Sequence, residues 1–119
     1  MRKSIIALFG LLLMSCNESE QYKEIVGEWK CSKWITESTG ADKCKDNVYF
    51  NFKEDKTYSS KIGGTQESGV YKIAEGMLYS TAQGKMEIGV EISKLNKDTL
   101  QFVMSNLGEK EILTLLRKK

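Results

Sequence analysis

The stretch Ile25-Val26-Gly27-Glu28-Trp29-Lys30-Cys31 decides the fold of this chain. Two apolar residues, Ile25 and Val26, precede a Gly-x-Trp motif at the start of a predicted strand. The residues after it alternate in the manner of short β-strands, and the residues before it have the features of an export signal. We therefore predict one small β domain that wraps back onto Trp29, preceded by a targeting segment.

Downstream of Trp29, apolar and polar residues alternate with the period of two that is typical of half-buried strands. The clearest amphipathic strand covers residues 86–93, with Glu87 and Glu91 on its predicted outer face. The inward positions of this and the other strands are Val48, Phe50 and Phe52; Tyr58, Ser60 and Ile62; Gly69, Tyr71 and Ile73; Met86, Ile88, Val90 and Ile92; and Leu100, Phe102 and Met104. Short strands at 77–82 and 112–117 complete the set.

Turn sequences such as Glu54-Asp55-Lys56 and Gly63-Gly64 separate these strands at a spacing of about 8–12 residues, which is typical of an antiparallel barrel or sandwich. The chain has no proline, so no strand is confined to a sheet edge by a missing N–H. Closing the sheet removes its free edges. We predict an all-β fold, an eight-stranded antiparallel meander barrel, with a two-sheet sandwich as the alternative.

The N-terminus has the features of a bacterial lipoprotein signal peptide. Arg2 and Lys3 precede an apolar run of the length expected for a secretory signal, about 7–15 residues, which is too short to span a bilayer. The run ends in Leu13-Met14-Ser15-Cys16, and Leu-x-Ser-Cys resembles a lipobox, whose cysteine receives a diacylglycerol and becomes the new N-terminus. An ordinary signal peptide with an incidental cysteine is the alternative.

These features divide the chain into a signal peptide over 1–15, a lipidated tether over 16–24 and a barrel domain over 25–119. The full chain has a formal net charge of +2, and Arg2 and Lys3 account for it, so the mature domain is near neutral. It has no basic run with interleaved aromatics, so we predict no nucleic-acid binding. Each buried acyl CH₂ contributes about 0.8 kcal/mol, so a multiply acylated Cys16 holds the membrane without protein–lipid contacts.

Five motifs follow one another along the chain: Gly27-Glu28-Trp29, Phe52-Lys53-Glu54-Asp55-Lys56-Thr57-Tyr58, Gly69-Val70-Tyr71, Leu95-Asn96-Lys97-Asp98-Thr99-Leu100 and Leu113-Thr114-Leu115. In this order they resemble the small lipocalin-like domains of Bacteroidetes-type bacterial lipoproteins. Each motif is weak alone, and their order over nearly the whole mature chain carries the resemblance. Glu18 and Glu20 also resemble the acidic export tags of some surface lipoproteins. The resemblance implies an outer-membrane lipoprotein that faces the periplasm or the cell surface.

The resemblance also implies a structural role for Gly27, Trp29 and Arg117. In lipocalins the Gly-x-Trp tryptophan plugs the closed end of the barrel, and an arginine from the end of the last strand lies over it. Arg117 is the only arginine after Cys16. A guanidinium stacked on an indole contributes about 0.5–2 kcal/mol. The alternative is that Arg117 is a solvated residue near the C-terminus.

The sequence argues against an enzyme. It has no histidine, which removes Ser-His and Cys-His nucleophile pairs, His-ligated zinc and the usual general base near neutral pH. Its acidic residues are predicted to lie mostly in turns or on outward strand positions, and no glycine-rich loop precedes a helix. We expect no catalytic residues, no metal site and no cofactor.

Cys31 and Cys44 are left once Cys16 is lipidated. Two cysteines in an exported chain favour a disulfide, which would close a loop of about 14 residues and stabilise the fold by about 3 kcal/mol. A free, buried Cys31 is the alternative. The disulfide would tie the first strand to the polar loop 35–43, which we place at the open end of the barrel.

Two functions fit the sequence. The first, implied by the resemblance, is binding of a small hydrophobic or amphipathic ligand, with a candidate wall of Phe50, Phe52, Tyr58, Tyr71, Ile88, Val90, Phe102 and Met104. The second is a packed barrel that contacts another envelope protein, because eight strands leave only enough room for side chains to fill the interior. Alternation places Trp34 on the face opposite Trp29, partly exposed, as interface aromatics often are.

Overall fold

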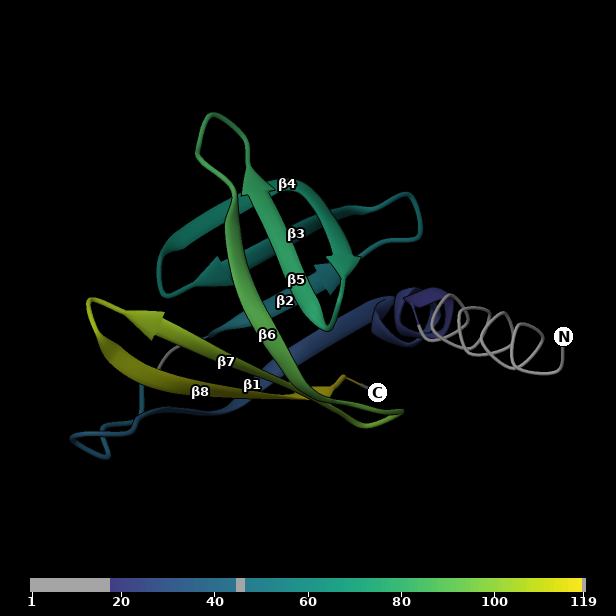
Figure 1. Cartoon of the computed structure of the whole chain (residues 1–119). Helices are drawn as coiled ribbons and strands as arrows, with labels where there is room; N and C mark the ends of the chain where they lie inside the picture. Colours follow the sequence, from purple (N-terminus) through teal and green to yellow (C-terminus); the bar gives the residue numbers. More distant parts are fainter. Residues whose placement is uncertain (1–17, 45–46, 119) are drawn as a thin grey trace, which may run out of the picture.

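The computed structural model describes residues 18–44 and 47–118, so Cys16 and the predicted signal peptide lie outside the described residues. A helix over 18–25 precedes eight strands in this part of the chain (Figure 1). The strands are β1 Gly27–Thr36, β2 Tyr49–Phe52, β3 Thr57–Ile62, β4 Thr65–Ala74, β5 Met77–Ala82, β6 Ile88–Leu95, β7 Thr99–Asn106 and β8 Glu109–Arg117. No helix among these residues is both long and apolar enough to span a membrane.

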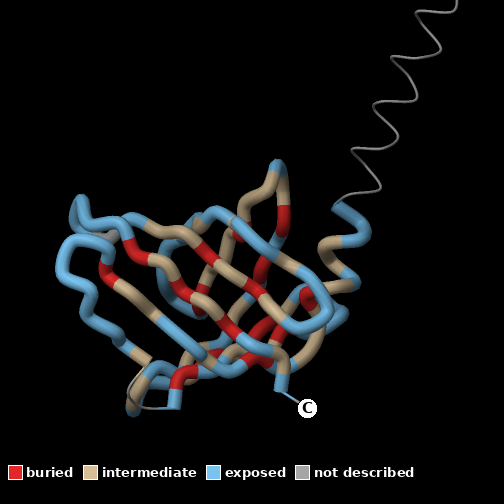
Figure 2. Tube along the Cα trace, turned by 90° about the horizontal axis from the view of Figure 1, so that it is seen from below, coloured by how far each residue is buried: buried red, intermediate tan, exposed pale blue. Residues whose placement is uncertain are grey.

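Each strand pairs antiparallel with the next, and β8 pairs back with β1 to close a barrel. The predicted eight-stranded meander barrel is confirmed, and the sandwich alternative is wrong. Figure 2 shows buried and exposed residues alternating along the strands, as the period-two pattern predicts. The buried cluster inside the barrel is built from Ile25, Trp29, Phe52, Tyr58, Tyr71, Ile73, Leu78, Leu100, Phe102, Leu113 and Leu115.

We call the end of the barrel that holds Trp29 the closed end. Trp29 is completely buried, and its indole Nε1 donates a hydrogen bond to the carbonyl of Ile25 at 2.8 Å. The guanidinium carbon of Arg117 lies 4.2 Å from the centre of the Trp29 rings. Arg117 also donates to the carbonyls of Glu24, Val26 and Lys97, so it joins the helix, the residue before β1 and the β6–β7 turn.

Gly27 is the residue that allows this arrangement. Its φ is +133°, a conformation that side chains with a Cβ rarely adopt. A Cβ built there would lie 2.5 Å from the Arg117 Nη1 atom. The glycine of Gly-x-Trp therefore makes room for the arginine that covers the tryptophan.

The helix is docked on the closed end, although the sequence predicts a polar tether over 16–24. The hydroxyl of Tyr22 accepts a hydrogen bond from the backbone N–H of Ile73 at 2.7 Å and lies 3.3 Å from the Ile73 carbonyl. The Tyr22 ring lies 6.2 Å from the ring of Tyr71, and the ammonium of Lys56 lies over it. The folded domain thus includes the helix over 18–25 and does not begin at residue 25.

A β-bulge in β1 changes which side chains enter the barrel. The pairing with β8 shifts between Cys31 and Lys33, so the strand carries one extra residue on its path. Trp34 then lies opposite the buried Leu113 and packs against the core. The prediction that Trp34 points away from the Trp29 face is wrong, because a single inserted residue reverses the alternation beyond it.

Candidate functional site

The predicted ligand wall divides into two halves along the barrel. Four of its residues are buried in the core and fill the closed half: Phe52, Tyr58, Tyr71 and Phe102. The other four are less buried, and Phe50 lies opposite Trp29, Val90 opposite Leu78 and Met104 opposite Glu111. Phe50, Val90 and Met104 are partly buried against the core, and Ile88 is 61% exposed. A ligand could therefore contact the second group, whereas the first group serves as packing.

The small inward residue Gly69 suggested space inside the barrel, but a side chain at this position would not fit. A Cβ at Gly69 would lie 2.0 Å from the Thr81 carbonyl oxygen, so the glycine permits a close approach of β4 and β5. Ser60, the other small inward residue, is also buried. The close approach of the Thr81 carbonyl therefore explains the glycine at position 69.

The tyrosines of the closed half are satisfied core residues. The Tyr71 hydroxyl donates to the Lys53 carbonyl at 2.8 Å, and burial raises the pKa of Tyr71 to about 12. Burial also raises the pKa of Tyr58, against a weaker lowering effect from its hydrogen bond with Ser80. Within the described residues, no buried side-chain nitrogen or oxygen lacks a hydrogen-bond partner. Both phenols are therefore neutral structural groups at physiological pH.

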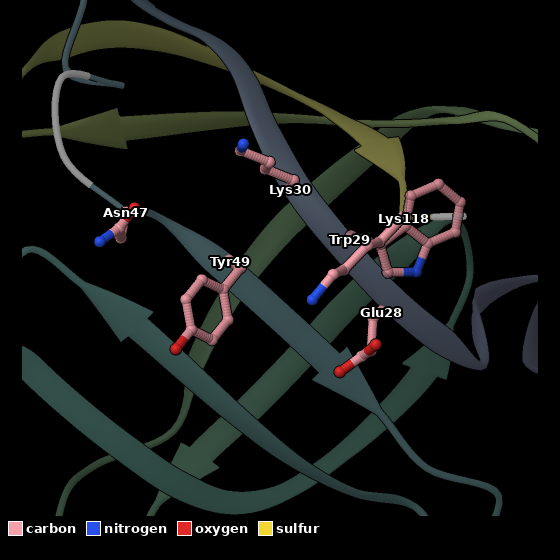
Figure 3. Close-up of a pocket in the computed structure, with 6 residues that line it drawn as sticks. All are labelled: Glu28, Trp29, Lys30, Asn47, Tyr49 and Lys118. Carbon is pink, nitrogen blue, oxygen red and sulfur yellow. The ribbon is translucent and has the colours of Figure 1, made fainter.

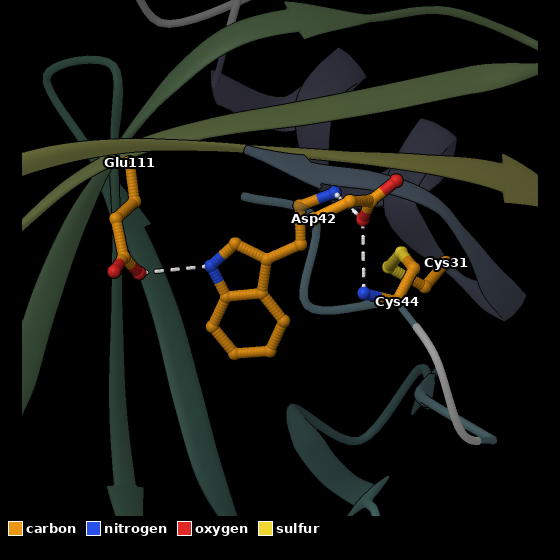
Figure 4. Close-up of a disulfide and its surroundings, with 5 residues drawn as sticks. Cys31, Asp42, Cys44 and Glu111 are labelled. Atoms are coloured by element: carbon orange, nitrogen blue, oxygen red, sulfur yellow. Dashed lines mark hydrogen bonds between the residues drawn. A yellow bond between two sulfur atoms is a disulfide. The ribbon is translucent and has the colours of Figure 1, made fainter. Parts of the chain in front are cut away.

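A buried carboxylate lies at the opposite end of the barrel, which we call the open end. Glu111 on β8 faces inward opposite Thr36, and it is 2% exposed. Its Oε1 accepts a hydrogen bond from the Trp34 indole Nε1 at 2.9 Å (Figure 4), and its Oε2 accepts one from the Thr36 hydroxyl at 3.4 Å. The Lys43 ammonium contacts the same Oε2 atom at 2.5 Å. A buried charge needs such partners, since desolvation otherwise costs several kcal/mol.

The loop that supplies Lys43 is fixed to β1 by its backbone. One carboxylate oxygen of Asp42 accepts the N–H groups of Trp34 and Cys44, at 3.0 and 2.9 Å (Figure 4). The Lys43 N–H donates to the Trp34 carbonyl at 2.8 Å. A disulfide joins Cys31 to Cys44, so the predicted disulfide is confirmed and the alternative of a free Cys31 is wrong.

The sequence predicts the last strand from Ile112 and acidic residues mostly in turns or on outward faces, so it does not identify Glu111 as a site residue. Glu111 is an exception that points inward. The alternation that includes Leu113, Leu115 and Arg117 places Glu111 on the same inward face when it is continued by one step. The missing signal was therefore the length of β8, which begins at Glu109.

Exposed apolar side chains surround the open end. They come from three neighbouring turns and the strand ends beside them, and we call them the apolar rim: Ile62, Met86, Ile88 and Leu107. Ile88 is exposed even though it faces inward, because β6 pairs with β7 only from Glu91 to Leu95 and separates from it nearer the open end. The open end thus carries exposed apolar side chains on three turns and the buried Glu111 carboxylate on β8.

A separate hollow of about 310 Å³ lies on the outer wall near the start of β1 (Figure 3). Its lining comprises Glu28, Trp29, Lys30, Asn47, Tyr49 and Lys118. Of these residues Trp29 is completely buried inside the barrel. The hollow is therefore lined mainly by the other five side chains, which lie on the outer surface. None of the predicted ligand-wall residues lines it.

The described residues contain no group of three or more His, Cys, Asp or Glu side chains that could hold a metal. Gly27, Trp29 and Arg117 act as structural residues at the closed end, and Cys31 and Cys44 fix the loop at the open end. The arrangement at the open end offers apolar contacts and one buried negative charge.

Comparison with known proteins agrees with this architecture. The profile of the lipocalin-like domain family matches residues 25–102. This chain belongs to the lipocalin-like domain family. The predicted family resemblance is thereby confirmed.

The barrel of this lipocalin-like chain is also similar to a solved structure, a lipocalin-like protein from Bacteroides uniformis. The two share 18% sequence identity with a TM-score of 0.59, over 81% of this chain and 99% of the other. At that identity the likeness shows the fold alone. Among curated proteins, none matches this chain significantly.

Proposed function

We propose that this chain is a non-enzymatic lipoprotein of the bacterial cell envelope whose lipocalin-like barrel binds a small hydrophobic or amphipathic ligand at its open end. The observation that supports ligand binding most directly is the exposure of inward-facing Ile88 at the same end of the barrel as the buried Glu111 carboxylate. Apolar contacts with a few fixed polar groups are the usual composition of a small-molecule site. The packed closed half limits the ligand to the open half.

The membrane anchor rests on the Leu13-Met14-Ser15-Cys16 motif and on the position of the helix. In the sequence only Asn17 separates Cys16 from the helix over 18–25, which is docked on the closed end. One extended residue spans about 3.6 Å, so a lipidated Cys16 would hold the closed end near the bilayer. The open end would then face away from the anchoring membrane, where it is accessible to ligands and proteins.

Metabolic labelling with palmitate tests the anchor. We expect the wild-type chain to be labelled and to fractionate with outer membranes, and Cys16→Ser to lose both properties. A labelled Cys16→Ser variant, or an unlabelled wild-type chain, would contradict lipidation at this residue. Protease added to whole cells then distinguishes surface display from a periplasmic location.

Native mass spectrometry of the soluble chain from Asn17 tests ligand binding. A lipid-sized adduct is expected on the wild-type protein and should be lost in Ile88→Glu, which places a charge among the apolar contacts. Val70→Glu is the matched control, because Val70 is similarly exposed but lies on the outer wall. An adduct that survives Ile88→Glu, or is lost equally in Val70→Glu, argues against binding at the open end.

A second function, contact with another envelope protein, is favoured by the apolar rim. Leu107, at the β7–β8 turn, is 98% exposed, and exposed apolar side chains that cluster at one end are typical of interaction surfaces. Crosslinking in intact envelopes distinguishes this function. A bare mass in the native spectrum together with a crosslink that Leu107→Glu abolishes would favour the protein partner over the ligand.

A further inference from the structure

The charge pair at the open end is built from two unequal partners. The Glu111 carboxylate belongs to a strand and its side chain is 3% exposed, whereas the Lys43 side chain belongs to a loop and is 42% exposed. The carboxylate therefore cannot leave the barrel without disrupting β8. The ammonium can leave it, because a lysine side chain is long and flexible.

The backbone around Lys43 does not need to move for this to happen. The Asp42 carboxylate accepts the Trp34 N–H, and the disulfide joins Cys44 to Cys31, so the loop is held to β1 on both sides of Lys43. Rotation of the Lys43 side chain alone would vacate the position beside Glu111. Because the loop backbone is fixed, Glu111, Trp34 and Thr36 can stay in place when another cation replaces the Lys43 ammonium.

The groups around that position are those that recognise an organic cation. Glu111 supplies a buried negative charge, oriented by the Trp34 indole and the Thr36 hydroxyl. The Lys43 ammonium also lies 5.6 Å from the centre of the Trp34 ring, within the range of a cation–π contact. Met104, which lies opposite Glu111 on β7, provides an apolar contact beside the charge, and the apolar rim lies at the same end of the barrel.

We propose that Glu111, Trp34 and Thr36 form a binding site for the ammonium group of an amphipathic amine, and that Lys43 occupies this site when no ligand is bound. This proposal rests on the proposed function and names its ligand class. The ligand's hydrocarbon part lies toward Met104 and the apolar rim. Lys43 acts as an intramolecular competitor, and so it lowers the apparent affinity by the fraction of time that it fills the site.

A second strand carboxylate that forms an ion pair with a lysine outside the strands offers a matched control. Glu67 on β4 lies opposite the buried Ser60 and forms an ion pair with Lys85 from the β5–β6 turn. The Glu67 side chain is more exposed than that of Glu111, and no tryptophan donates to it in the described structure. Removing Lys85 should therefore leave a solvated carboxylate and create no site for an amine.

The test is chemical rescue of Lys43→Ala by butylammonium chloride, measured as the shift in thermal unfolding temperature relative to equal potassium chloride. We expect butylammonium to raise the unfolding temperature of Lys43→Ala and to leave Lys85→Ala unchanged. The double variant Lys43→Ala/Glu111→Gln should show no rescue. If Lys43→Ala does not fold, Lys43→Met, which keeps the apolar stem, replaces it.

Dodecylammonium binding, followed by tryptophan fluorescence, gives the second readout. Its dissociation constant should fall by about tenfold from wild type to Lys43→Ala if the site is open for roughly a tenth of the time in the wild type. Unchanged affinity, or equal rescue of Lys43→Ala by potassium chloride, overturns the amine site. A neutral apolar adduct that persists without any amine effect leaves the proposed function standing, whereas loss of both rejects both.

Discussion

Replacement of Trp29 should have a large effect on stability, because this side chain is completely buried, donates a hydrogen bond and stacks with Arg117. Trp29→Ala removes a fully buried indole, for which a loss of about 3–5 kcal/mol in the free energy of unfolding is expected. It also removes the donor to the Ile25 carbonyl and the surface on which Arg117 stacks. The three contacts are made by one side chain and are coupled, so their individual energies are not added to the loss of about 3–5 kcal/mol.

Trp29→Phe separates the hydrogen bond from most of the apolar volume. It keeps an aromatic ring inside the barrel but leaves the Ile25 carbonyl without its side-chain donor, so we expect a loss of about 1–3 kcal/mol. The matched control is Tyr49→Ala, which removes a partly exposed aromatic from the outer wall and should change stability by about 0.5 kcal/mol or less.

Urea unfolding followed by far-ultraviolet circular dichroism measures this series without relying on tryptophan emission. The expected order of stability is wild type and Tyr49→Ala, then Trp29→Phe, then Trp29→Ala. A Trp29→Ala variant that loses less than about 1 kcal/mol would refute the assignment of Trp29 as the structural plug. A variant already unfolded without urea would agree with it, because domains of this kind have only about 5–15 kcal/mol in total.

Three further predictions concern the open end, the β4–β5 contact and the alkaline limit of stability. The double variant Cys31→Ser/Cys44→Ser should lose about 3 kcal/mol in the free energy of unfolding measured in urea. If neither this variant nor the reduced wild type is less stable than the oxidised wild type, the disulfide does not stabilise the fold. Gly69→Ala should cost about 1–3 kcal/mol, because its Cβ would meet the Thr81 carbonyl, while Gly64→Ala, with open space around it, should be nearly neutral in the same assay. The pKa of Tyr71 is raised from 10.0 to about 12, so the proton is held more tightly in the folded state; the resulting stability is complete below pH 10.0 and is lost as the pH rises toward 12. Absorbance titration of the phenols should show this late ionisation in the wild type and not in Tyr71→Phe, and a Tyr71 that ionises near pH 10 would contradict its burial.

Much of the barrel could be predicted from local pattern. Period-two alternation and turn residues located all eight strands, because one face of each strand is buried and the other is solvated. The two cysteines predicted the disulfide because an exported chain favours their oxidation. These are consequences of single segments and of the compartment, and neither needs long-range information.

The candidate site could not be predicted in the same way. The β1 bulge between Cys31 and Lys33 inserts one residue that leaves no mark in the sequence pattern, yet it decides that Trp34 enters the barrel and reaches Glu111. Ile88 was assigned correctly to the inner face, but its exposure follows from the separation of β6 and β7. Both outcomes depend on pairing between strands, which alternation within one strand does not specify.

The loop that carries Lys43 also bears on aggregation. Beyond Cys31, β1 has left β2, and its unpaired edge is covered by its own continuation: Thr36 N–H donates to the Ala41 carbonyl, Lys43 N–H donates to the Trp34 carbonyl, and Ile35 bridges to Asp42. The Cys31–Cys44 disulfide holds this cover in place. A reduced chain can release the cover and present the edge to another molecule, as uncovered strands do. Oxidation of the two cysteines therefore completes a protective cap over β1, and chain produced in a reducing cytoplasm should be the form that self-associates.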